Sequence, residues 1–156
     1  MTEMAVKLIT AVIGTLGITV LFGVHHKRIP FAVLGGLLSC AVYLGLQCCW
    51  DNLFACAFAA GMVAAAYSEI MARVLKTPVT IMLLPSIIPL VPGGNLYYAM
   101  SSLVFGEAYN FVDFGLKTVL IAVGIAVGIL AISILAGLLV PLYRYFSFLQ
   151  KEKIHE

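Results

Sequence analysis

The side chains best suited to bind a small polar solute lie around a break in an otherwise apolar segment. Pro85, Pro89 and Pro92 occur at spacings of four and three, and Gly93-Gly94 follows directly. Each internal proline removes a backbone donor and clashes with the preceding turn, which costs about 3 kcal/mol or more in a helix interior. Residues 78–105 therefore cannot form one regular helix. Freed carbonyls and a new helix amino end offer dipoles without full charges, as in the broken helices of secondary transporters.

Amide and hydroxyl side chains come directly after this break. We expect the prolines and glycines to shape the break and the polar side chains to contact a solute. The predicted pathway residues are Pro89, Pro92, Gly93, Gly94, Asn95, Tyr98 and Ser101. Unsatisfied backbone costs several kcal/mol per group in hydrocarbon, so the break is expected to face inward. The alternative is a kinked packing helix whose hydroxyls bond to their own backbone.

Glu69 is the one acidic residue expected at membrane depth. An intramembrane carboxylate is by default a functional hypothesis, here a role in proton coupling. Glu69 also lies four residues before Arg73, so a helix-end ion pair is the alternative.

The sequence offers few residues for metal binding or catalysis. Cys40, Cys48, Cys49 and Cys56 fall inside apolar segments without the Cys-x-x-Cys spacing of metal sites, and we interpret them as small packing residues. The sequence shows no nucleophile–base arrangement, phosphate loop or paired catalytic carboxylates. We therefore predict a protein that is not an enzyme and needs no cofactor or metal.

The composition indicates an integral membrane protein. Of the 156 residues, 63% are apolar and 10% charged, and the mean hydropathy is +1.11. A soluble chain carries roughly 25% charged residues, so a soluble enzyme is excluded. The 9 basic residues are scattered, without the stripe that a nucleic-acid partner requires.

Apolar windows predict an all-α polytopic protein with about five transmembrane helices, the fourth broken by prolines and glycines. The expected spans form a single transmembrane domain over 1–156. They lie at about 4–24, 30–50, 53–72, 78–105 and 117–141, followed by a cytoplasmic tail at 142–156. Pro30 suits the first turn of a helix. A loop is expected over 106–116.

The amino-terminal segment has the outline of a signal peptide, but its apolar run is long and lacks a small-x-small cleavage site. We interpret it as a retained first span. With the amino terminus outside, seven basic residues fall on the cytoplasmic side and only Lys7 and Lys117 on the other. This positive-inside bias predicts a multi-pass plasma-membrane protein with its carboxyl terminus in the cytoplasm.

Small residues predict where helices approach closely. Gly124-x-x-x-Gly128 lies in the last span, Gly14-x-x-Gly17 in the first and Gly61 in the third. Packing within this chain and a face for a second copy are both open, so a homo-oligomer is one possible assembly.

The chain resembles the threonine/serine exporter family. The similarity lies in Ala72-Arg73 through Lys76-x-Pro78, in Ile87-Ile88-Pro89-Leu90-Val91-Pro92-Gly93-Gly94 and in Tyr97-Tyr98-Ala99-Met100. Phe22-Gly23-Val24, Arg28-Ile29-Pro30 and Gly35-Gly36 are similar too. More narrowly, the chain resembles the small, membrane-only component of two-component exporters.

The resemblance implies export of small hydrophilic metabolites, either threonine and serine or a dicarboxylate such as succinate, driven by the proton gradient. It also implies a larger partner subunit in the same lipid bilayer. The chain has no arginine inside a span to pair with a substrate carboxylate, so helix dipoles or the partner are expected to supply that recognition. The alternative function is a non-transporting subunit that stabilises a larger transporter, and a membrane-embedded enzyme is disfavoured.

Overall fold

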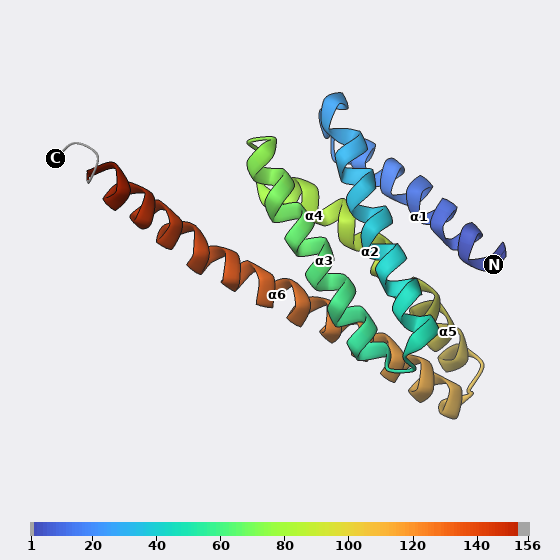
Figure 1. Ribbon diagram of the computed structural model, residues 1–156. Helices are drawn as coiled ribbons and strands as arrows, with labels where there is room; N and C mark the ends of the chain where they lie inside the picture. Colours follow the sequence, from blue (N-terminus) through green and yellow to red (C-terminus); the bar gives the residue numbers. More distant parts are fainter. Residues whose placement is uncertain (1, 153–156) are drawn as a thin grey trace.

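The structure is a computed structural model that describes the backbone of residues 2–152 and the side chains of residues 4–138. Its regular structure within these residues is helical (Figure 1). The helices are α1 (Thr2–Leu21), η1 (His26–Arg28), α2 (Ile29–Cys49), α3 (Leu53–Val74), α4 (Val79–Ile87), η2 (Ile88–Leu90), α5 (Gly93–Val104) and α6 (Ala108–Glu152), where η denotes a 3₁₀ helix.

Four helices in the described chain are long and apolar enough to cross a membrane alone. The segments Val79–Leu90 and Gly93–Val104 meet this standard only together, bent by 53° at a short break, and would make a fifth crossing. The predicted all-α fold, with about five membrane helices and a broken fourth, is confirmed.

Local signals explain where the helices begin and end. Pro30 lies in the first turn of α2, as predicted. The Asn52 side chain caps α3 by accepting hydrogen bonds from the backbone N–H groups of Phe54 and Ala55, at 3.1 and 3.2 Å. Gly23 and Gly106 follow α1 and α5 with positive φ angles of 64° and 75°, the conformation that glycine favours after a helix.

The α2–α3 hairpin lies at the centre of the bundle (Figure 1). On one side, α1 packs against α2, and α4 packs against both α2 and α3. On the other side, α6 packs against α3 and α5. The later part of α6 extends beyond the other helices (Figure 1).

Glycines bring α3 and α6 into backbone contact. A Cβ added at Gly124 would lie 2.8 Å from the Phe54 carbonyl oxygen, and one at Gly61 would lie 2.9 Å from the Ile125 carbonyl oxygen. A Cβ at Gly128 would collide with the carbonyl oxygen of Phe58. These small residues therefore pack within the chain, which resolves the two alternatives at this contact.

The loop expected over 106–116 is wrong in length, because α6 already begins at Ala108. Asp113 and Lys117 pair on the helix surface at 2.7 Å with i, i+4 spacing, which stabilises a helical turn. At its other end α6 continues to Glu152, through most of the predicted tail, and residues 153–156 of that tail lie outside the described residues.

Candidate functional site

The broken fourth span consists of three short helical pieces. Pro85 lies inside α4, Pro89 lies in the first turn of η2, and Pro92 precedes α5. The backbone N–H of Leu96 donates to the Pro92 carbonyl at 3.0 Å, so a new helix starts directly after the bend. The prolines thus produce the two helix ends that the sequence predicts.

The predicted pathway residues divide between two faces of the break. Pro89 is half-buried and faces α1 and α2. Gly93 and Gly94 are exposed, and a Cβ at either would have no described neighbour within 4 Å. Among the described helices α5 packs mainly against α6, and the Gly93-Gly94 part of the break is exposed in this chain alone, so the inward orientation of the break stays a prediction about the assembled protein.

The polar residues after the break differ in exposure. Asn95 and Ser101 are half-buried, whereas Tyr98 is 55% exposed. The Tyr98 ring lies beside the Phe114 ring of α6, with 5.4 Å between centroids. Tyr98 thus lies beside α6, and none of these three side chains lines the cavity that Pro89 lines.

A cavity of about 500 Å³ lies between α1, α2 and η2. Small-molecule sites commonly occupy 300–1,000 Å³, so it has room for a small metabolite. Its lining residues come from α1 (Val6, Lys7, Thr10, Ala11, Gly14), from α2 (Cys40, Tyr43, Leu44, Gln47) and from η2 (Ile88, Pro89).

The polar groups of this cavity lie on two facing helices. The Gln47 side-chain N–H donates to the Tyr43 hydroxyl at 3.2 Å, and the Thr10 hydroxyl donates to the Val6 carbonyl at 2.8 Å. Lys7 supplies the positive charge. These residues were not predicted from the sequence as a site, although positions 7, 10 and 14 and positions 40, 43 and 47 recur at helical spacing.

Buried serines connect α2 to the helix before the break. The Ser39 hydroxyl donates to the carbonyl oxygens of Ser86 at 2.6 Å and of Gly36 at 3.0 Å. A Cβ at Gly35 would meet the side chains of Ser86 and Tyr67, so α2 and α4 pack closely here. This contact fixes α4 immediately before the bend.

Glu69 lies on α3, and it is not among the residues that line this cavity. Its carboxylate pairs with Arg73 at 3.0 Å with i, i+4 spacing, and the Glu69 side chain is 19% exposed against 53% for Arg73. The ion-pair alternative is thus observed, while the largely buried carboxylate keeps the coupling hypothesis available.

Among the cysteines, Cys40 and Cys56 are buried, consistent with packing residues. Cys48 and Cys49 are exposed at the end of α2, so the packing interpretation is wrong for these two.

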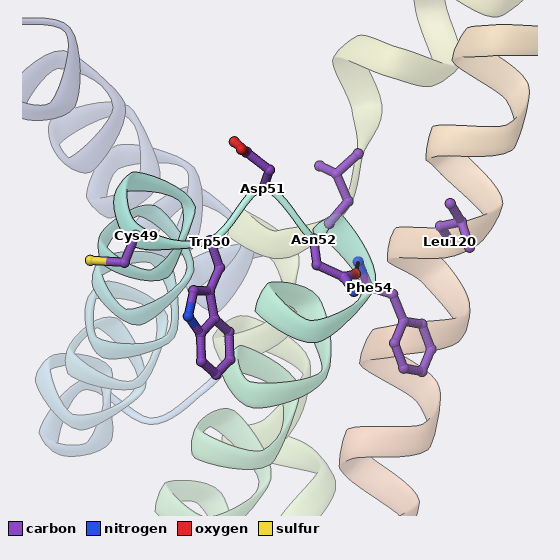
Figure 2. A pocket seen from close by; sticks show the side chains of 7 residues that line it. Cys49, Trp50, Asp51, Asn52, Phe54 and Leu120 are labelled. Atoms are coloured by element: carbon purple, nitrogen blue, oxygen red, sulfur yellow. Dashed lines mark hydrogen bonds between the residues drawn. The ribbon is translucent and has the colours of Figure 1, made fainter.

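A second cavity, of about 680 Å³, lies beside the α2–α3 turn (Figure 2). Asn52 caps α3 there, and Asp51 extends from the turn away from Phe54 and Leu120 (Figure 2). The cavity contains no predicted pathway residue. The α1–α2–η2 cavity is therefore the better candidate, because it adjoins the broken helix.

Comparison with known proteins gives one family. A family model described as "Threonine/Serine exporter, ThrE" matches residues 7–135, which include the broken span and every residue that lines the cavity except Val6. No curated protein and no solved structure matches the chain.

Proposed function

Because the chain belongs to the threonine/serine exporter family, we propose that it is the membrane subunit of a secondary transporter that exports small hydrophilic metabolites. Its substrates are threonine and serine or a dicarboxylate such as succinate. The observation that carries the proposal is that Pro89, within the broken span, lines a mainly apolar cavity that also holds Lys7, Thr10, Tyr43 and Gln47. Discontinuous helices beside a cavity are the usual substrate sites of such transporters.

The exposed half of the break supports a larger partner subunit. Gly93 and Gly94 lie on the surface of this chain, near the middle of a bent membrane span. Irregular backbone at membrane depth is tolerated only where protein covers it or water fills a cavity beside it. A partner that packs on α5 would cover this backbone and complete a pathway past Asn95, Tyr98 and Ser101.

Glu69 is the proposed coupling group. It is the acidic side chain of α3, largely buried yet only one turn from the exposed Arg73. Protonation would release its ion pair and remove the charge from the bundle. We expect Glu69→Gln to export without dependence on the proton gradient, and unchanged coupling in this variant would remove the assignment.

We assign the protein to the plasma membrane with its amino terminus outside and its carboxyl terminus in the cytoplasm. The turn after α1 then carries Lys27 and Arg28 on the cytoplasmic side, and the end of α3 and the turn after it carry Arg73 and Lys76.

The test is efflux of labelled threonine, serine and succinate from cells that express this chain alone, the larger subunit alone, or both. Efflux only with both chains would support a shared pathway. Efflux with the larger subunit alone would make this chain a stabilising subunit, and absence of efflux in every case would contradict the proposed substrates.

A matched amide pair tests the pathway residues. Asn95→Ala should abolish export while the protein still inserts, whereas Asn110→Ala, at the exposed start of α6, should not affect export. Wild-type export from Asn95→Ala would remove Asn95 from the site. Changes at Gly124 and Gly128 cannot separate the transporting from the stabilising role, because both glycines hold the chain's own fold together.

A further inference from the structure

The α1–α2–η2 cavity has one charged side chain at a position that calls for an explanation. Lys7 is exposed and lies one turn inside the start of the apolar window of α1, which runs from Met4 to Leu21. Ionisable residues inside membrane spans are expensive and usually functional. The described residues that line the cavity include this cation and no carboxylate. An anionic group would therefore be attracted to this cavity.

Neutral donors and acceptors surround the same space. The Tyr43 hydroxyl accepts from Gln47, which leaves its own proton available to a solute, and Thr10 lies one turn from Lys7 on α1. A carboxylate accepts several hydrogen bonds, and charge-assisted ones are about twice as strong as neutral ones. The combination suits a small carboxylate whose remaining atoms contact hydroxyl and amide groups.

Gly14 lines the cavity without a side chain, and a Cβ there would have no described neighbour within 4 Å. Ile88 and Pro89 line the cavity from the break, so an occupant would contact both α1 and η2. The cavity therefore has Lys7 and the broken helix in the same lining.

We infer that this cavity binds the carboxylate group of the exported solute, with Lys7 as its cationic partner and Thr10, Tyr43 and Gln47 as neutral contacts. The inference rests on the proposed export function and assigns its recognition site to this chain rather than to the partner.

The first experiment measures export kinetics of the complete transporter for labelled succinate and threonine and for their amides, succinamate and threoninamide. Lys7→Gln should raise the half-saturating concentration of the carboxylates by about 10- to 100-fold, the expected loss for a charged hydrogen bond. It should also reduce the preference for carboxylate over amide. Lys7→Arg should retain most of that preference.

Lys117→Gln is the matched control. Lys117 is the other basic residue assigned to the outer side, but it pairs with Asp113 on α6 and does not line the cavity. Its loss should leave the preference unchanged. A purely anchoring Lys7 would alter insertion or amount of protein without altering the preference for carboxylates, and that result would overturn the assignment.

Gly14→Leu tests the space itself. The leucine side chain should fill the cavity and abolish export while the protein remains inserted, whereas Gly17→Leu, outside the lining, should export normally. Normal export from Gly14→Leu would contradict an occupied cavity.

A binding measurement separates the site from the export function. Thr10→Cys in the complete transporter should react with a small thiol reagent, and succinate or threonine should slow this reaction, as read by peptide mass spectrometry. Gly17→Cys should react at the same rate with and without solute. Protection without efflux would support the site and contradict the export function. Efflux without protection at residue 10, with an unchanged preference in Lys7→Gln, would overturn the site alone.

Discussion

Glycines have opposite consequences in two regions of this molecule. Where α3 crosses α6, a Cβ at Gly61, Gly124 or Gly128 would lie 3.0 Å or less from the backbone of the facing helix. Where α1 faces α2 beside the cavity, a Cβ at Gly14 would have no described neighbour within 4 Å. The first set lets backbones touch, and the second leaves room between helices. A glycine in a membrane helix therefore indicates a need for space without showing what fills it.

The two regions also differ in what holds them together. Helices in a bilayer gain little from the hydrophobic effect and associate through close packing and interhelical hydrogen bonds. The α3–α6 contact depends on packing. The α2–α4 contact beside the cavity includes the interhelical hydrogen bond from Ser39 to Ser86. A closely packed α3–α6 contact next to the α1–α2–η2 cavity suits a transporter that must hold its shape while a solute moves through it.

The largest effect should come from Gly128→Ala. A Cβ there collides with the Phe58 carbonyl oxygen and would lie 3.0 Å from the Met62 backbone nitrogen, so α3 and α6 must separate. Overpacking typically costs about 1–3 kcal/mol. The measurement is the free energy of unfolding in mixed detergent micelles.

Gly137→Ala is the control for this change, because Gly137 lies on the same helix with no described neighbour within 4 Å of its Cβ position. Equal stability of the two variants would contradict the packed contact and remove one side of the comparison.

The α3–α6 contact was easier to predict from the sequence than the α1–α2–η2 cavity. The Gly124-x-x-x-Gly128 spacing places both glycines on one helix face, and Gly61 lies on a small-residue segment that such a face would match. The proline spacing likewise predicted the break, because proline changes backbone geometry whatever surrounds it. These are local constraints, and each acts through the residue itself.

The α1–α2–η2 cavity and the exposure of the break could not be predicted in the same way. Lys7 was counted only as a basic residue on the outer side, because a role in the cavity depends on which residues of α2 and η2 face it. The direction in which Gly93 and Gly94 face is set by what covers α5, and among the described helices α5 packs mainly against α6. The start of α6 was placed too late because Asp113 and Lys117 look like loop residues until they pair on a helix.

A smaller effect is expected from Ser39→Ala, which removes the hydrogen bond from α2 to the Ser86 carbonyl, 2.6 Å long. Interhelical hydrogen bonds in membranes contribute about 0.6 kcal/mol on average and up to about 1.7, so we expect a loss of about 1 kcal/mol in the same unfolding assay. Ser68→Ala is the matched control, since the buried Ser68 hydroxyl donates to the Ala64 carbonyl of its own helix. A greater loss from Ser68→Ala than from Ser39→Ala would show that the α2–α4 contact does not depend on this bond.

The smallest effect, and the one that most sharpens the comparison, should come from Gly14→Ala. The added methyl group enters open space, and replacing glycine where no clash occurs reduces the freedom of the unfolded chain. Stability should therefore rise slightly, by about 0.4–1 kcal/mol. On the facing helix, Gly36→Ala should instead destabilise the protein, because its Cβ would lie 2.9 Å from the Thr15 Cγ2 atom, and Thr15 is fully buried. If alanine raises the free energy of unfolding at Gly14 and lowers it at Gly36, then α1 and α2 are in close contact at Gly36 and separated at Gly14. A loss at Gly14 as large as that at Gly128 would mean that another chain fills this space, and the cavity would then be an assembly surface rather than a solute site.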